Sequence, residues 1–124
     1  MAGTLTISTL SDGTNSTSST NCIKGSAKAW VNYAGSTATI NSSFNVSSIT
    51  RNSTGQYVVN FTTAMSNANY AASVAQQFNV VNTQGIYQIW TTGLTSSALP
   101  VNFATYNNGA YQDPAAVHIS VFSS

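Results

Sequence analysis

Apolar and polar side chains alternate at period two through most of this chain, and no segment shows the 3.6-residue period of an amphipathic helix. Such alternation is typical of β-strands that turn one face to a core and the other to solvent. Eight or so short strands at spacings of about ten residues predict an all-β fold class, an antiparallel β-sandwich or jelly roll. The clearest one-sided faces hold Ala27, Ala29, Val31 and Tyr33 in AKAWVNY, and Val117, Ile119 and Val121 in AVHISVF.

The segment VSSITRNSTGQYVVNFT predicts the clearest hairpin. Its second strand places Tyr57, Val59 and Phe61 on one face. The polar loop between its two strands includes Gly55, which can adopt the positive φ that a tight turn requires. Further strands are expected within residues 37–46, 70–81, 86–90 and 99–106.

A polar run near the start, SDGTNSTSSTN, contains no apolar residue. It cannot bury a core, and we expect it to form a linker or an extended arm. The chain is therefore divided into residues 1–24, an N-terminal strand and polar arm, and residues 25–124, a β-sandwich domain. We expect the strand TLTISTL of the arm to pair with a sheet edge of a neighbouring subunit.

Charge is nearly missing from this chain. Only 4% of its 124 residues are charged, against 42% that are hydrophobic, whereas roughly a quarter of an ordinary domain is charged. A net charge of +1 provides no field to attract nucleic acid or an anionic membrane. No stretch approaches the roughly 18 apolar residues of a membrane span, so we expect neither nucleic-acid binding nor membrane insertion. The start, MAGTLTISTL, lacks the basic flank and long apolar run of a signal peptide.

Few side chains could perform catalytic chemistry. A glycosidase needs two carboxyls roughly 5 to 9 Å apart, so both Asp12 and Asp113 would have to serve, yet each adjoins a turn-forming residue. A nucleophilic triad would have to combine His118 with one of these aspartates and with Cys22 or a serine. Cys22 is alone and can form no internal disulfide. We therefore expect no enzyme activity and no cofactor.

Four segments carry a resemblance to a known family: GSAKAWVNY, FNVSSITRNSTGQYVVNFTTAM, SNANYAASV and the closing VHISVF. They resemble a small β domain of many tailed-bacteriophage proteins, usually found at the distal, C-terminal ends of tail fibres. The resemblance covers roughly residues 25–75 well and the last strand loosely, and it does not extend to residues 78–115. It implies a virion protein made in the host cytoplasm, folded as a β-sandwich and assembled as a homotrimer at the particle surface.

The resemblance implies a non-enzymatic virion surface protein of tail-fibre type, which attaches the particle to a host surface glycan or protein. A tail-fibre tip normally follows a long shaft and an attachment domain, whereas this motif begins about two dozen residues after Met1. The alternative is therefore a capsid decoration (cement) protein that binds the major capsid protein. A carbohydrate-binding module is a more distant alternative. A shared fold does not distinguish among these three functions, because one fold can serve many functions.

Trp30 lies in the segment that carries the resemblance, between Lys24 and Lys28 on one side and Asn32 on the other. Such a strip could bind through cation–aromatic contacts, but two lysines are too few for a nucleic-acid footprint. We expect Trp30 to be a buried or interface anchor. His118 is expected on the outward face of the last strand. In a trimer, three copies of His118 on the threefold axis could instead hold a metal, but the paired His-x-His that metal-binding tail fibres carry is absent, so we expect no metal.

Aromatic and amide side chains gather in the second half of the chain. Tyr87 and Trp90 lie in the predicted strand IYQIW and are expected in the core. The segment YNNGAYQD is expected to form an exposed loop, and Tyr and Asn are typical of sugar-binding and protein-binding loops. The predicted contact residues for a partner or receptor are Tyr106, Asn107, Asn108, Tyr111 and Gln112.

Overall fold

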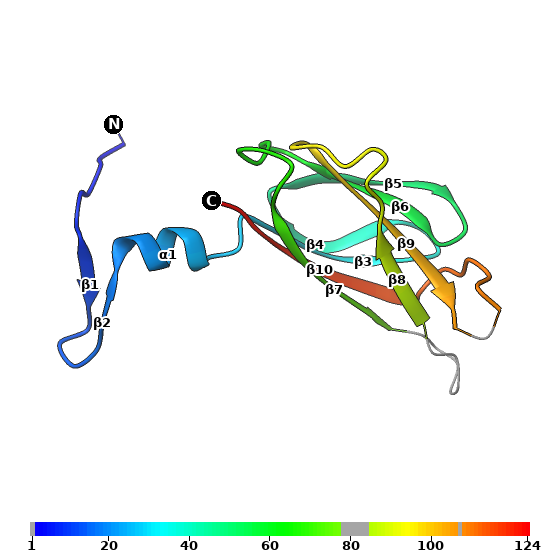
Figure 1. Ribbon diagram of the computed structural model, residues 1–124, viewed down its shortest axis with the longest axis horizontal. Helices are drawn as coiled ribbons and strands as arrows, with labels where there is room; N and C mark the ends of the chain where they lie inside the picture. The colour runs from blue at the N-terminus through cyan, green and yellow to red at the C-terminus, as the bar shows by residue number, and fades with distance from the viewer. Residues whose placement is uncertain (1, 78–84, 107) are drawn as a thin grey trace.

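A computed structural model describes residues 2–77, 85–106 and 108–124. Two four-stranded antiparallel sheets pack face to face (Figure 1), which confirms the predicted all-β sandwich. Sheet I has the strand order β4 (Thr39–Phe44), β3 (Ala29–Ala34), β10 (Ala116–Phe122) and β7 (Ala71–Gln77). Sheet II has the order β5 (Val46–Ser53), β6 (Gln56–Phe61), β9 (Ala98–Thr105) and β8 (Gly85–Ile89).

The core lies between the sheets and is built from the faces that the alternation predicted. β6 buries Tyr57, Val59 and Phe61, and its outward residues are half-buried. Three rings pack together in the core: Tyr57 lies 5.4 Å from Tyr33, with the two rings tilted, and 5.8 Å from Phe103, edge to face, measured between ring centroids. The remaining buried apolar residues come from both sheets and include Ala29, Val31, Val74, Leu99, Val101, Val117, Ile119 and Val121.

Asn45 forms the corner at which the chain passes from sheet I to sheet II, because it alone separates β4 from β5. Its φ of 55° lies in the left-handed region, which Asn tolerates better than most residues. Its side chain holds the corner in place. The amide nitrogen donates to the carbonyls of Lys28 and Thr63, both at 3.0 Å, and the amide oxygen accepts from the Thr63 N–H at 2.7 Å.

Residues 2–25, here called the arm, project away from the sandwich (Figure 1). The arm consists of a hairpin, β1 (Thr9–Ser11) and β2 (Ser16–Ser18), followed by helix α1 (Ser19–Gly25). None of its residues is buried. No helix among the described residues is long and apolar enough to span a membrane.

The polar run of the arm has more regular structure than the sequence predicted. Hydrogen bonds from side chains to nearby backbone groups take the place of a core here. The Asp12 carboxylate accepts from the N–H groups of Thr14 (2.9 Å) and Asn15 (2.7 Å) and closes the hairpin turn. The Ser18 hydroxyl accepts from the Asn21 N–H at 3.2 Å and caps the helix. The sequence predicted a linker or an extended arm here, and the structure adds a short hairpin and a helix to this segment.

Gly35 gives a direct test of how closely the end of β3 packs against the loop that precedes β10. A Cβ at Gly35 would lie 2.1 Å from the Pro114 carbonyl oxygen, so Gly35→Ala must push two backbone segments apart. Overpacking of this kind costs about 1–3 kcal/mol, and a domain of this size loses about 4 °C in Tm for each kcal/mol. We expect thermal unfolding followed by circular dichroism to show a Tm about 4–12 °C lower.

The matched control is Gly3→Ala, since a Cβ at Gly3 meets nothing within 4 Å. Its Tm should equal that of the unmodified protein. Equal Tm values for the two variants would contradict the packing described here.

Candidate functional site

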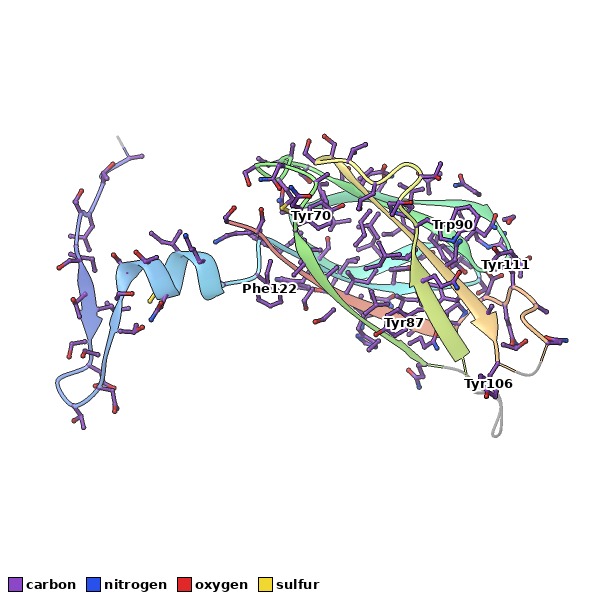
Figure 2. All side chains as sticks on the ribbon, in the orientation of Figure 1. Tyr70, Tyr87, Trp90, Tyr106, Tyr111 and Phe122 are labelled. Carbon is purple, nitrogen blue, oxygen red and sulfur yellow. The ribbon has the colours of Figure 1, made fainter. Side chains whose placement is uncertain are left out.

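The loop between β9 and β10 presents two exposed tyrosines. Tyr106 is 68% exposed and Tyr111 is 43% exposed. Figure 2 shows them at separate points of the same end of the sandwich. Each therefore offers a ring face on its own rather than as part of a single stack.

The amide residues predicted for this loop have different surroundings. The amide oxygen of Asn108 accepts from the Thr105 hydroxyl (2.6 Å) and the Ala110 N–H (3.0 Å), so it closes the turn. Gln112 is half-buried, and its N–H donates to the Phe103 carbonyl at 3.1 Å. Asn107 lies outside the described residues. Among the predicted contact residues that the structure describes, Tyr106 and Tyr111 thus have the most side chain free for a partner.

Asp113 anchors the end of this loop to sheet II. Its carboxylate accepts from the Arg51 guanidinium, at 3.1 Å from Nε and 2.6 Å from Nη2, and from the Gly55 N–H at 2.8 Å. The hydroxyl of Tyr57 is also bonded to it. The sequence predicted only a turn at Asp113. The ion pair joins residues far apart in the chain, and the one available signal was that the sequence holds a single arginine and only two aspartates.

The same network sets the ionisation of its members. Partial burial by itself raises the pKa of Asp113, but the hydrogen bonds from Arg51, Tyr57 and the Gly55 N–H outweigh it and hold the pKa below its ordinary value. Burial, followed by the hydrogen bond to Asp113, raises the pKa of Tyr57 well above its usual range. The group is therefore an ionised carboxylate with a neutral phenol, which suits a structural tie.

The two carboxylate side chains of the chain do not meet. Asp12 closes the hairpin turn of the arm, whereas Asp113 lies in the loop between β9 and β10 and is bonded to Arg51 and to the Gly55 N–H. Within residues 2–77, 85–106 and 108–124, no group of three His, Cys, Asp or Glu side chains could hold a metal ion. The expected lack of enzyme activity stays a prediction.

Trp30 is not buried, which corrects one half of the expectation for this residue. It lies 39% exposed on the outer face of sheet I, opposite Phe44 of β4, which is 55% exposed. The period-two alternation accounts for this position, since Val31 and Tyr33 occupy the inward face. A shallow open hollow beside the indole is lined by Asn32, Ser42, Ser73, His118 and Ser120, among others. An interface role for Trp30 stays a prediction.

The lysines near Trp30 do not form a cationic strip with it. Lys28 turns its ammonium group to the end of α1, where it donates to the Ile23 carbonyl. Lys24 lies in the last turn of α1, within the arm. His118 lies on the exposed outer face of β10, as predicted. Its meeting with other copies on a threefold axis stays a prediction.

Tyr87 and Trp90 were expected in the core, and this was wrong: they are 50% and 41% exposed. The cause is that β8 is an edge strand of sheet II, with a neighbour on one side only. Trp90 follows β8, and its indole Nε1 donates to the side-chain oxygen of Asn102 at 2.7 Å when that amide is oriented to satisfy both of its hydrogen bonds. Both tryptophans thus lie on outer surfaces of the sandwich, where they are available to a partner.

Comparisons of the chain with models of protein families, with curated proteins and with solved structures found no match.

The Asp113 network predicts how stability depends on pH. A carboxylate whose pKa is lowered by folding stabilises the protein above its unfolded pKa of about 3.9 and loses this contribution as the pH falls through the folded pKa. The Tm of the unmodified protein should therefore be constant between about pH 5 and 7 and fall below about pH 4. Asp113→Asn should have a lower Tm at pH 7, and its Tm should fall less steeply as the pH drops below about 4.

The control for this experiment is Asp12→Asn. Asp12 lies in the arm, outside the core, and the pKa of its carboxyl is lowered chiefly by the N–H groups of Asn15 and Thr14, and further by the side-chain amide of Asn15. The Tm of Asp12→Asn should fall below about pH 4 as steeply as that of the unmodified protein. If the Tm of Asp113→Asn also falls as steeply, the ionisation of Asp113 does not contribute to stability.

Proposed function

We propose that this protein is a non-enzymatic bacteriophage virion surface protein of tail-fibre type, assembled as a homotrimer, which contacts a receptor on the host surface. The observation that carries the proposal is the two-ended layout of the molecule. The arm leaves one end of the sandwich, and the loop with Tyr106 and Tyr111 lies at the other (Figures 1 and 2). One end is thus available for assembly on the particle while the other faces outward.

The sequence resemblance to tail-fibre domains agrees with this layout. Its best-covered part, roughly residues 25–75, forms β3 to β6 and most of β7, which are strands of both sheets. The loop with Tyr106 and Tyr111 lies outside that part. Loops on a rigid sandwich can change their contacts without disturbing the core, so a shared scaffold with a variable loop suits proteins that bind different receptors.

The chemistry of the loop favours an uncharged receptor group, either a neutral glycan or a polar protein surface. Tyr106 and Tyr111 combine flat apolar area with a hydroxyl, which suits sugar rings and peptide groups alike. The one carboxylate nearby, Asp113, is already bonded to Arg51. Binding at this end should therefore depend little on salt.

The arm also supports the alternative of a capsid decoration protein, because its uncovered apolar residues could attach to a major capsid protein. Counting copies of the chain per purified particle by quantitative mass spectrometry separates the two. A handful to a few dozen copies is expected for a fibre, and hundreds would indicate decoration. Absence of the chain from purified particles would contradict both.

Receptor contact is tested by Tyr111→Ala and Tyr106→Ala in the whole protein. Truncating an aromatic contact residue costs about 2 kcal/mol of binding or more, which is roughly a thirtyfold loss of affinity. Because both side chains are exposed and neither belongs to the core, the Tm should change by no more than about 2 °C. The measurement is attachment of labelled protein to host cells.

Trp30→Ala is the matched control, since it removes an exposed aromatic from a different face of the sandwich. Attachment should be unchanged in this variant. If the tyrosine variants attach normally while Trp30→Ala does not, the receptor site lies on sheet I and the loop assignment is wrong.

A further inference from the structure

All residues of β9 except its first and last are buried. Leu99, Val101 and Phe103 belong to the core between the sheets. The residues that alternate with them point to the outer face of sheet II and are Pro100, Asn102 and Ala104. A sheet with one face on a core commonly leaves its other face to solvent, so other parts of the chain must cover the outer face of β9.

Two aromatic side chains lie over this outer face. The indole N–H of Trp90 donates to the side-chain oxygen of Asn102 at 2.7 Å, and the Trp90 backbone N–H donates to the Pro100 carbonyl at 3.2 Å. Tyr111 lies opposite Ala104 in an antiparallel bridge, and residues opposite each other in such a pair share one face. Pro100 and Ala104 are separated along the extended strand by roughly 13 Å. Trp90 and Tyr111 (Figure 2) therefore lie at the two ends of one outward surface.

Polar side chains lie between the two aromatic rings. Gln56 of β6 and Gln88 of β8 pair with Asn102 from either side, so the two glutamines share its face. Gln88 is exposed and Gln56 is half-buried, whereas Asn102 is 6% exposed. Asn102 thus holds the Trp90 indole in position, and the two glutamines are the amides that a ligand can reach.

Both rings are open to solvent as well. Trp90 is 41% exposed and Tyr111 is 43% exposed. An open hollow beside the indole is lined by Gln88, Thr91 and Thr92, among others. The surface therefore combines two exposed aromatic rings with amide and hydroxyl groups.

This surface carries no charge of its own. None of the outward residues that the structure describes in sheet II is charged, and those of β5 include Ser48 and Thr50. Asp113 follows Tyr111 closely in the chain, but it is bonded to Arg51. A ligand at this surface therefore meets aromatic carbon and neutral hydrogen-bonding groups, with no charge to pair with.

We propose that this surface of sheet II binds a neutral oligosaccharide, with Trp90 and Tyr111 as stacking residues and Gln56 and Gln88 as hydrogen-bond partners. The C–H face of a pyranose ring packs on an aromatic ring. The hydroxyls of the sugar both donate and accept hydrogen bonds, as amides do. Two aromatic rings roughly 13 Å apart along a strand require a chain of sugars rather than a single one.

A folded protein partner matches this surface less well. A specific protein interface has an apolar centre and a polar rim. Here the order is reversed, because the amides of Gln56 and Gln88 lie at the centre and the rings of Trp90 and Tyr111 lie at the margins.

This inference rests on the proposed function, because Tyr111 belongs to the proposed receptor loop. It names the receptor group as a neutral glycan rather than a polar protein surface. It also extends the site from the loop to Trp90, which follows β8.

The first experiment follows the indole N–H signals of the two tryptophans in the intact, isotope-labelled protein by NMR. Uncharged hexasaccharides of glucose, mannose, galactose or N-acetylglucosamine are added singly at millimolar concentration. At least one of them should shift the signal of Trp90. Trp30 is the internal control, since it lies on the outer face of sheet I and its signal should stay in place. A panel that leaves Trp90 unshifted, or shifts both signals equally, would overturn the proposal.

The second experiment measures the affinity of variants for the sugar that binds, from the backbone amide signals. Trp90→Ala and Tyr111→Ala should each weaken binding roughly thirtyfold. Gln88→Ala, which removes an exposed amide, should weaken it roughly fivefold. None of the three residues belongs to the core, so each variant should give the well-dispersed spectrum of a folded protein.

Tyr87→Ala is the matched control. Tyr87 is 50% exposed on the same strand as Gln88, but it lies opposite Phe103 and therefore on the other face of sheet II. Its affinity for the sugar should equal that of the unmodified protein. A loss as large as that of Trp90→Ala would place the binding elsewhere and overturn the proposal.

The outcomes separate this inference from the proposed function. If no hexasaccharide binds while Tyr111→Ala loses attachment to host cells, the oligosaccharide site is overturned and the receptor loop stands, with a protein surface as its partner. If a sugar binds through Trp90 and Tyr111 while attachment does not depend on Tyr111, the oligosaccharide site stands and the receptor role is wrong.

Discussion

Tyr57 contacts both sheets of the sandwich and the loop between β9 and β10 that is the proposed receptor site. Its ring lies in the core between Tyr33 of sheet I and Phe103 of sheet II. Its hydroxyl lies 2.9 Å from the carbonyl oxygen of Gly35, at the end of β3, and is also bonded to the carboxylate of Asp113 at the end of the loop. One side chain thus ties both sheets and the loop together. The loop is held in place on the sandwich because Asp113, near its C-terminal end, is bonded to Arg51, Gly55 and Tyr57.

The scarcity of charge shapes how the rest of the molecule is held. Among the described residues, Arg51 and Asp113 form the one ion pair. Elsewhere, hydrogen bonds of neutral amides and hydroxyls stabilise the turns and caps. Asn45 fixes the corner between the sheets, Asn108 closes the turn in the loop, and Ser18 caps the helix. Neutral hydrogen bonds are little affected by salt, so both the fold and its exposed surfaces should persist over a wide range of ionic strength.

The strands could be predicted because a half-buried strand leaves a period-two pattern in the sequence, and the inward residues of β3, β6 and β10 were identified correctly. Large aromatic residues were harder to place. The pattern itself put Trp30 on the face opposite Val31, and the general tendency of tryptophan to be buried led to the half of the expectation, burial in the core, that was wrong. Tyr87 was misplaced because the sequence does not reveal which strand lies at a sheet edge.

Contacts between residues that are distant in the chain could not be predicted from the sequence. The bond between Arg51 and Asp113 depends on how β5 and the loop meet in space, and no local pattern encodes it. In the arm, Asp12 and Ser18 are residue types that favour a turn and a helix N-cap, respectively. These local signals were overlooked because the segment contains no apolar residue that would indicate a strand or a helix. The loop itself could be predicted from its composition. The structure adds that Tyr106 and Tyr111 are exposed while Asn108 is engaged in the turn.

The central claim is that the arm attaches the protein within an assembled particle and the tyrosine loop faces outward. Maleimide labelling of intact particles tests this claim directly, with a single cysteine placed at Thr14 in the arm or at Ala110 in the loop, each in a Cys22→Ser background. Both positions are exposed in the protein alone, so both variants should label when free. On particles, the account predicts that the loop position still labels and the arm position is protected. Labelling of the arm with protection of the loop would contradict it.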